Sequence, residues 1–504
     1  MSLEIALPIL LPLFFGAASL AAHRHLTLQR WLGVGGTAAL LAATLWLLNS
    51  VWQEGMVVMH MGDWQAPFGI TLAADLLGAS MAVLTALLGL ATAVYSLATT
   101  PVGHEHYGHW PLLHLLLAGV AGAFLTGDIF NLYVWFEVML VASFALLTLG
   151  GERAQMEGAI KYVALNLLAS MIFLSAAGIT YGLVGTLNMA DIAAKLGEVD
   201  QPGLVSTLAA MYMVAFGIKA GAFPLFFWLP ASYHTPPIAV SALFAGLLSK
   251  VGVYALYRFF TLIFTQDVAY THEILLWGAG LTMLAGVLGA LAQTEIRRIL
   301  SFQIISSVGF MLMGLALFTP LALAGGILYM AQDIVVKIAL FLVAGIMFRL
   351  LGSYHLAELG GLYRYRPWLA VLFLLPALSL VGLPPLTGFI AKLALVRAAL
   401  EEGAWWVTFA ALLTSLLTLI SVTRIWQQGF WRELPARVTD PEVVTGERRD
   451  TTLWLMYLPV VVLSALVLLF GLYAQPLFML SEGAAGQLLD TRAYIEAVLG
   501  EGAP

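Results

Sequence analysis

The sequence predicts an all-α polytopic membrane protein with about fourteen transmembrane helices. Of the 504 residues, 61% are hydrophobic and only 10% are charged, and the mean hydropathy is +0.94. A soluble domain carries about 25% charged residues. Apolar runs of about 18 or more residues, each long enough to cross a bilayer as a helix, recur along almost the whole chain. The short alternating strands of an outer-membrane barrel are not seen.

The apolar runs place the spans in chain order and leave no room for a soluble domain, so residues 1–504 are expected to form a single membrane domain. No lysine or arginine precedes the first run, whereas a cleaved signal peptide needs a basic start, so we expect a retained helix. The spans are expected near residues 3–22, 31–51, 70–98, 110–127, 129–149, 158–184, 205–229, 237–262, 273–292, 298–318, 321–350, 368–400, 404–427 and 453–475.

Arginines are concentrated in every second connection between these spans. Cytoplasmic loops carry an excess of arginine and lysine, so we expect the odd-numbered loops to be cytoplasmic and both termini to be outside. The even-numbered loops and their flanks hold little beyond Lys195, Arg258 and Arg397. The odd-numbered loops hold Arg24, Arg30, Arg153, Arg297, Arg298, Arg349, Arg364, Arg366, Arg424, Arg432, Arg437, Arg448 and Arg449.

Lysines, in contrast, lie mostly inside apolar segments. An arginine stays protonated in essentially any site, but a buried lysine can lose its proton. An ionisable group deep in a membrane is a functional candidate by default. The candidates for a proton pathway are therefore Lys161, Lys219, Lys250, Lys337 and Lys392. Lys161 lies near the end of its span and can equally well extend to the surface. For the other four, a structural hydrogen-bonding role is the alternative.

One carboxylate, Glu137, stands in the apolar run FNLYVWFEVMLVASF. It follows Asp128 by about nine residues, which places it about 13 Å into the membrane. A charged carboxylate at this depth needs a cationic partner or takes up a proton. We expect Glu137 to control the charge of a lysine; a neutral glutamate that bonds a neighbouring helix is the alternative.

Prolines stand beside two of the lysines. Lys219 precedes Pro224 in GIKAGAFPLFFWLPASYHTPP, and Lys392 follows Pro385 in LVGLPPLTGFIAKL. Proline interrupts the helical hydrogen-bond ladder, and broken helices near the midplane are typical of transporter ion sites. We therefore expect spans 7 and 12 to be broken. His234 follows the first break, where it could either relay protons or anchor the loop.

The two halves of the chain resemble each other in the spacing of their lysines. Similar spacings separate Lys161 from Lys337 and Lys219 from Lys392, which suggests two inverted five-helix repeats, spans 4–8 (110–262) and 9–13 (273–427). In this register Ser306 and Ser307 take the place of Glu137; they can hydrate a proton path but supply no carboxylate. Residues 476–504 are expected to form an external C-terminal tail that lies on the membrane, on a partner subunit or free.

Several classes of chemistry are excluded or unsupported. With no cysteine, the chain has no disulfide, thiolate metal site or thiol nucleophile. No phosphate loop, dinucleotide fingerprint or nucleophile constellation is present, so we expect no enzyme activity, no cofactor and no metal site. No basic block suggests nucleic acid.

Four stretches resemble a known family: GDIFNLYVWFEVMLVASFALL, WLPASYHTPPIAVSALFAGLLSKVGVYALYRF, QDIVVKIALFLVAG and GLPPLTGFIAKL. They are similar to the antiporter-like subunits shared by respiratory complex I, membrane-bound hydrogenases and Mrp-type cation/proton antiporters. The resemblance covers nearly the whole chain. The residues of the first stretch and the length of the chain are most similar to those of the Mrp branch.

The resemblance implies roles at the matching positions. Glu137 and Lys219 match a carboxylate–lysine pair in the first half-channel, Lys250 and Lys337 match lysines of the eighth and eleventh spans, and Lys392 matches the terminal residue, which is a glutamate in some relatives. The stretch MAQDIVVK lacks the histidine of several relatives, so a proton relay there would need water or Asp333.

The function that follows is a proton-translocating subunit of a multisubunit Na⁺/H⁺ antiporter in the cell membrane, with other subunits, protons, Na⁺ and the lipid bilayer as its partners. Two alternatives stay open. The chain could be a proton-pumping subunit of a redox-driven complex such as complex I or a membrane-bound hydrogenase, or it could be an inactive scaffold.

Overall fold

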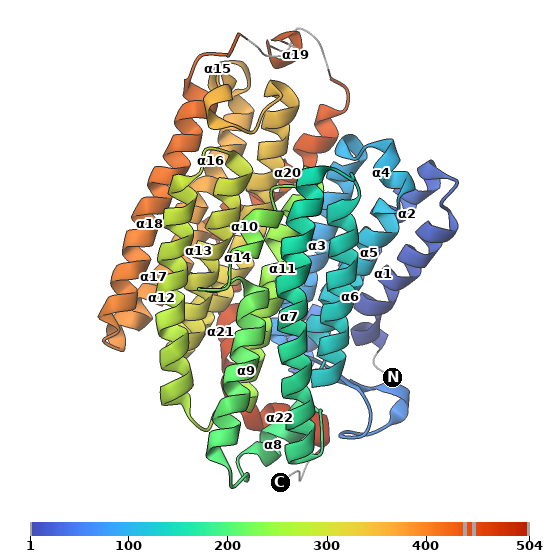
Figure 1. The fold of residues 1–504 in the computed structure, drawn as a ribbon, viewed down its shortest axis with the longest axis vertical. Helices are drawn as coiled ribbons and strands as arrows, with labels where there is room; N and C mark the ends of the chain where they lie inside the picture. Colours follow the sequence, from blue (N-terminus) through green and yellow to red (C-terminus); the bar gives the residue numbers. More distant parts are fainter. Residues whose placement is uncertain (1–2, 437–440, 446–449, 501–504) are drawn as a thin grey trace.

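The computed structural model describes residues 3–436, 441–445 and 450–500. Three of the loop arginines, Arg437, Arg448 and Arg449, lie outside the described residues, as do residues 501–504 of the expected tail. Long helices lie side by side along the longest axis of the molecule, and both termini lie at the same end (Figure 1).

The predicted fold class is confirmed, because each expected span contains an apolar helix. Twelve helices in the described residues are long and apolar enough to cross a membrane. Two shorter apolar helices, His109–Leu125 and Pro367–Val381, occupy the fourth span and the first half of the twelfth. The exact number of membrane crossings stays a prediction.

The N-terminal part departs from the expected pattern at the third span. Strand β2 (Thr71–Ala74) pairs with β1 (Val57–His60) in an antiparallel hairpin, so the expected helix start at residue 70 is wrong. The helix begins only after Asp75, whose side chain accepts a 2.8 Å hydrogen bond from the Gly78 N–H and caps the first turn. The other elements are α1 (Leu3–Ala21), α2 (Leu26–Glu54), η1 (Met61–Asp63), α3 (Leu76–Thr99) and α4 (Val102–His106).

The seventh span is broken, as its prolines predict. Helix α9 ends at Ala220 and helix α10 begins only at Trp228. The elements of this part are α5 (His109–Leu125), α6 (Ile129–Thr148), α7 (Arg153–Val184), α8 (Met189–Leu196), α9 (Pro202–Ala220), α10 (Trp228–Ser232), α11 (Ile238–Arg258) and the π-helical turn η2 (Phe259–Ile263).

The twelfth span is broken in the same way, between Val381 and Thr387. The elements of this part are α12 (Val268–Ala292), α13 (Ile296–Ala316), α14 (Pro320–Leu351), η3 (Leu356–Glu358), α15 (Leu362–Tyr365), α16 (Pro367–Val381), α17 (Thr387–Glu401), α18 (Trp405–Trp426) and η4 (Gln427–Trp431).

The two expected repeats share an order of elements but not a residue register. In each, the third helix has 32 residues and the fourth is broken. However, Lys161 is exposed whereas Lys337 is fully buried. Lys219 precedes its break, whereas Lys392 follows its own. The inverted relation between 110–262 and 273–427 therefore stays a prediction.

The C-terminal segment packs on the rest of the chain and is not a free tail. Its elements are α19 (Pro441–Thr445), α20 (Leu453–Leu472), α21 (Gln475–Leu489) and α22 (Thr491–Leu499). Helix α21 packs against α14 and α3, and α22 packs against α8. The Gln487 side chain accepts a 2.8 Å hydrogen bond from the Leu76 N–H. The Tyr494 ring covers the buried guanidinium of Arg258, which forms a 2.5 Å ion pair with Asp75.

The odd-numbered loops, which carry the described arginines, lie toward the end of the bundle opposite to the termini, where α15 and α19 lie (Figure 1). Arg30 pairs there with Glu105, and Arg349 with Asp450. We call this the arginine-rich end. The charge asymmetry of the sequence is therefore an asymmetry of the fold, although which end faces the cytoplasm stays a prediction.

Helices α11, α13 and α14 form the centre of the bundle. Nearly all of their residues are buried by other parts of the chain. A helix that is apolar on every side is stable only when it is surrounded by others. The ionisable residues on α11 and α14 are thereby shielded from lipid by protein.

Candidate functional site

The candidate residues lie on six helices that are neighbours in space. Helix α6 packs on α7, α7 on α9, α9 on α11, α11 on α14 and α14 on α17. They carry, in this order, Glu137, Ser170, Lys219, Lys250, the pair Asp333 and Lys337, and Lys392. The sequence predicted all of these residues except Ser170, but it did not predict how they are grouped.

The first group joins Glu137 to Lys219 through a serine. The Ser170 hydroxyl donates a short hydrogen bond to Oε1 of Glu137, and the Lys219 Nζ donates to the Ser170 Oγ at 3.0 Å. The Lys219 ammonium also lies 4.7 Å from the centre of the Phe136 ring. No direct ion pair between Glu137 and Lys219 is found in the described part of the chain. Glu137 itself is partly exposed at the surface of the chain.

Ser170 is the member of the first group that the sequence did not predict. A single serine in an apolar span carries no motif, and its neighbours Glu137 and Lys219 are 33 and 49 residues away in the chain. The sequence shows only that Ser170 carries a hydroxyl and that its helix, α7, lies in the chain between the helices of Glu137 and Lys219.

The break after α9 fixes the position of Lys219. Gly221 ends the helix with a φ of 78°, a left-handed conformation that favours glycine. The Trp228 indole N–H donates to the Ile218 carbonyl at 2.9 Å, and this carbonyl also accepts the Gly221 N–H at 3.1 Å. On the facing helix, a Cβ at Gly252 would lie 2.5 Å from the Ala220 nitrogen, so only glycine permits this close approach. The end of α9 is thus held directly against α11.

The second group is a carboxylate between two lysines. The Asp333 Oδ2 lies 2.9 Å from the Lys250 Nζ, and its Oδ1 lies 3.8 Å from the Lys337 Nζ. All three side chains are 0% exposed. Lys250 also donates a hydrogen bond to the Ala245 carbonyl at 2.8 Å. Its contact with Asp333 has the distance of an ion pair but not the angles of a hydrogen bond. The sequence predicts Asp333 as a relay beside Lys337, whereas the contact of Asp333 with Lys250 appears only in the fold.

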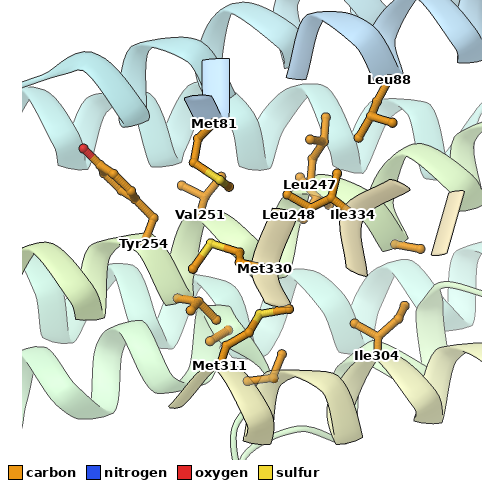
Figure 2. Close-up of a cluster of buried hydrophobic side chains, with 14 of the residues drawn as sticks. Met81, Leu88, Leu247, Leu248, Val251, Tyr254, Ile304, Met311, Met330 and Ile334 are labelled. Atoms are coloured by element: carbon orange, nitrogen blue, oxygen red, sulfur yellow. The ribbon is translucent and has the colours of Figure 1, made fainter. Parts of the chain in front are cut away.

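Apolar side chains surround this second group. Figure 2 shows Leu247, Leu248 and Val251 of α11 facing Met330 and Ile334 of α14. These five residues flank Lys250 and Asp333 in the chain and are buried. A low-dielectric surrounding strengthens every interaction between the charges that it encloses. The charge of one lysine in this group therefore depends strongly on that of the other.

Lys392 is bound to the broken end of α16. Its Nζ donates to the Leu380 and Val381 carbonyls at 3.0 and 2.9 Å, and to the Ser415 Oγ at 3.0 Å. These are among the last carbonyls of a helix, which have no partner within the helix itself. The ammonium also lies 4.5 Å from the centre of the Phe310 ring. Lys392 thus satisfies the backbone at the break, which is a structural role; its role as a proton carrier stays a prediction.

The four remaining candidates lie outside these groups. Lys161 and His234 lie apart from them, and Ser306 and Ser307 are buried hydroxyl residues. Lys161 is exposed and pairs with Glu157 on its own helix at 2.6 Å. His234 lies in the connection between α10 and α11. Ser306 and Ser307 are buried on α13, where the Ser307 Oγ accepts a 3.4 Å hydrogen bond from the Tyr329 hydroxyl. Tyr329 is one helical turn from Asp333, so Ser307 lies near the second group.

The geometry of His234 identifies its tautomer. Its Nδ1 lies 2.9 Å from the Pro230 carbonyl oxygen, and its Nε2 lies 3.1 Å from the Arg298 Nη2. A carbonyl only accepts and an arginine only donates, so Nδ1 carries the hydrogen and Nε2 accepts. Burial, followed by the charge of Arg298, lowers the pKa of His234 to about 4. The imidazole is therefore neutral at physiological pH and suits an anchor of the loop better than a proton relay.

We expect the connection around His234 to open more easily as the pH falls. Between about pH 6.5, the ordinary pKa of histidine, and about pH 4, the opened form binds a proton that the closed form lacks, so the free energy of opening decreases. Hydrogen exchange of residues 228–237 in the assembled complex, corrected for the intrinsic rate at each pH, measures this dependence. His234→Gln should remove most of it. Glu295, Arg297 and Arg298 are the other charged groups that act on the imidazole.

The exposed His355 provides the control for that experiment. His355→Gln should leave the pH dependence of exchange at residues 228–237 unchanged. An unchanged dependence in His234→Gln would contradict the assignment.

We expect Ser170→Ala to slow proton transport by roughly tenfold or more. A hydrogen bond to a charged group contributes about 1.5–3 kcal/mol, and here one hydroxyl bonds both charged groups. The initial rate of cation-driven proton exchange by the reconstituted complex measures the effect. Ser175→Ala is the control, because this serine is exposed on the same helix and bonds only the Met171 carbonyl. Equal rates for the two variants would contradict a role for Ser170.

Comparison with known proteins gives a consistent result. A family profile described as "NADH:quinone oxidoreductase/Mrp antiporter, TM" matches residues 126–418. The chain is 45% identical, over 99% of both chains, to a protein of Alkalihalophilus pseudofirmus that is named as the D subunit of a Na(+)/H(+) antiporter.

Two solved structures are similar over almost the whole fold. A chain of the Mrp complex from Dietzia sp. has a TM-score of 0.91 and 33% identity, with 99% of this chain and 100% of that chain covered. A chain of respiratory complex I from Thermus thermophilus has a TM-score of 0.80 and 26% identity, with 96% and 99% covered.

Proposed function

Because the chain belongs to the family of membrane subunits shared by NADH:quinone oxidoreductase and Mrp antiporters, we propose that it moves protons along its buried Glu/Lys row as the D-type subunit of a Na⁺/H⁺ antiporter. It is a proton-translocating subunit of a multisubunit membrane antiporter, and so a transporter rather than an enzyme. The single observation that supports the pathway is that ionisable side chains from Glu137 to Lys392, with Ser170 between the first two, lie on helices that pack against one another in sequence.

The first group acts as the charge control of the row. A carboxylate near Lys219 favours the protonated lysine, and Ser170 transmits this influence through two hydrogen bonds. When Ser170 turns away from either partner, Lys219 loses that stabilisation and releases its proton toward α11. The hydroxyl is suited to this task because a rotation about a single bond breaks the link.

The second group acts as a shared proton store. Asp333 balances one positive charge, whereas Lys250 and Lys337 both lie beside it. One of the two lysines is therefore favoured to be neutral, and a proton that arrives at one side promotes release from the other. Lys392 takes the released proton at the second broken helix, where the Leu380 and Val381 carbonyls stabilise the ammonium.

A function in a Na⁺/H⁺ antiporter is preferred over a function in a redox-driven proton pump. Identity is 45% to the antiporter protein but 26% to the complex I chain, and the chain spans almost the full length of both. The partners are accordingly the other subunits of a multisubunit antiporter complex in the cell membrane. We propose that the arginine-rich end faces the cytoplasm and that both termini are outside.

The remaining alternative, an inactive scaffold, is tested by a double variant. We expect Lys219→Ala/Lys392→Ala to reduce Na⁺-driven proton exchange by the reconstituted complex to the rate of empty vesicles. The reason is that the double variant lacks the proton-carrying lysine at each of the two broken helices. Lys161→Ala, which removes an exposed lysine paired only on its own helix, should keep the normal rate. Normal exchange by the double variant, in a complex of normal subunit composition, would establish the scaffold reading.

A further inference from the structure

A cavity of about 480 Å³ opens at the arginine-rich end and is not used by the pathway described above. It lies where α3, α7, α11, α14 and α20 meet, and its wall includes Thr99, Glu152, Ile238, Arg297 and Gly345. Arg297 is paired with Glu295 and stacked on the Tyr354 ring, so its charge is largely balanced. The cavity is wide enough for several water molecules.

Three hydroxyl groups on α3 and at its end continue inward from this cavity. Thr92, Ser96 and Thr100 follow one another at four-residue spacing on one face of the helix. Thr92 and Ser96 are 1% and 0% exposed. Within the described residues, none of the three hydroxyls has a hydrogen-bond partner. By contrast, Thr85 and Thr99 on the same helix bond the carbonyls of Met81 and Tyr95.

An unpartnered row of this kind needs an explanation. A buried hydroxyl without a partner costs about 1–3 kcal/mol, and threonine and serine in a helix usually avoid the cost by bonding a carbonyl of the preceding turn. Three successive groups that do not do so are satisfied together if water runs along the face that they share.

The face that carries Thr92 is directed at the seam between α11 and α14. Leu88, one turn before it, lies next to Gly246 and Ile338, and Figure 2 shows Leu88 beside Leu247 of α11. Tyr95, one turn after it, donates a 2.9 Å hydrogen bond to the Leu342 carbonyl of α14. Thr92 lies between these two contacts on the same helix face.

This seam lies between the two helices that carry the second group of the pathway. Ile338, which Leu88 approaches, is the neighbour of Lys337 in the chain. Gly345, in the cavity wall, is eight residues beyond Lys337 on α14, a distance of about 12 Å along the helix. Three hydroxyls at one-turn spacing cover about this length.

We propose that the cavity and the hydroxyls of Thr92 and Ser96 form a hydrated proton inlet from the arginine-rich end to Lys337 and Lys250, independent of Lys219. The inference rests on the proposed function, because it supplies protons to the lysines that carry them. Its consequence is that the second group takes up protons through this inlet, while the charge of the first group still controls their onward transfer.

Introduced thiols test the inlet directly, since the chain has no cysteine of its own. Thr92→Cys and Ser96→Cys in the assembled complex should react with methanethiosulfonate-ethylammonium added to the arginine-rich side, at rates within about tenfold of Thr99→Cys in the cavity wall. Thr85→Cys, whose position is bonded to its own helix, should stay unmodified. Mass spectrometry of this chain measures the labelled fraction.

The transport assay gives the second readout. Thr92→Val/Ser96→Ala should lower the rate of proton exchange at least fivefold, whereas Thr85→Val should not. Unreactive thiols at both positions, or a normal rate in the double variant, would overturn the inlet. Lys337→Ala separates the two proposals: if it is inactive while the double variant is normal, only the inlet fails, and if Lys337→Ala is active, the proposed pathway fails.

Discussion

Glu137→Gln is expected to abolish proton exchange while the complex assembles normally. Two hydrogen bonds in series place the Glu137 and Lys219 charges roughly 5 Å apart. At an effective dielectric constant of about 20, such a pair interacts by about 3 kcal/mol, or roughly a hundredfold in an equilibrium. Glutamine keeps the size and the acceptor oxygen for Ser170 but loses the charge, so the lysine is no longer controlled. Na⁺-driven pH change in vesicles that contain the purified complex measures the loss.

The control for this variant is Glu157→Gln on the neighbouring helix. Glu157 is exposed and pairs only with Lys161, so its replacement should leave the rate within about twofold of normal. The subunit composition of the purified complex checks assembly in both variants. A Glu137→Gln complex that exchanges protons at more than about a third of the normal rate would refute charge control by Glu137.

Asp333→Asn is expected both to stop transport and to destabilise the protein. The substitution leaves Lys250 and Lys337 beside each other without an anion, in a site that is 0% exposed. Removal of one partner from a buried ion pair costs about 3–5 kcal/mol, because the other charge remains uncompensated. Proton exchange and the thermal denaturation temperature of the purified complex measure the two effects.

A second substitution separates charge balance from proton transfer. Asp333→Asn/Lys250→Met removes one positive charge together with the negative one and keeps the apolar volume, so thermal stability should return toward normal. Transport should remain absent, since the second group has lost two of its three ionisable members. If the single Asp333→Asn variant transports at the normal rate, Asp333 is not part of the pathway. If the double variant is as unstable as the single one, charge imbalance is not the cause of the instability.

The sequence was most informative where a property is local. Apolar runs located the helices, because a span buries each of its residues in lipid or protein regardless of what lies beside it. Prolines pointed to both broken helices, because a missing N–H weakens the ladder locally. Pro376 and Pro459 nevertheless stay inside continuous helices, so a proline alone does not decide where a helix breaks. The error at residues 70–75 arose because a short strand and the start of a buried helix are equally apolar, and only the Asp75 cap separates them.

The sequence also nominated the ionisable residues of the pathway, since a charge in an apolar span is visible without a structure. Hydropathy cannot show which of them meet. Ser170 stands between Glu137 and Lys219, Asp333 lies between Lys250 and Lys337, and the C-terminal Tyr494 covers Arg258.

By itself, then, the sequence determined the fold class, the family and the list of candidate proton carriers, because each depends on residue type and helical position alone. The tertiary structure decided the grouping of these residues into a serine-bridged pair, a lysine–aspartate–lysine cluster and a lysine bound to the end of a helix. The physical reason is that hydrogen bonds and ion pairs act over a few ångströms between helices. Their partners are tens of residues apart in the chain, where no periodicity connects them.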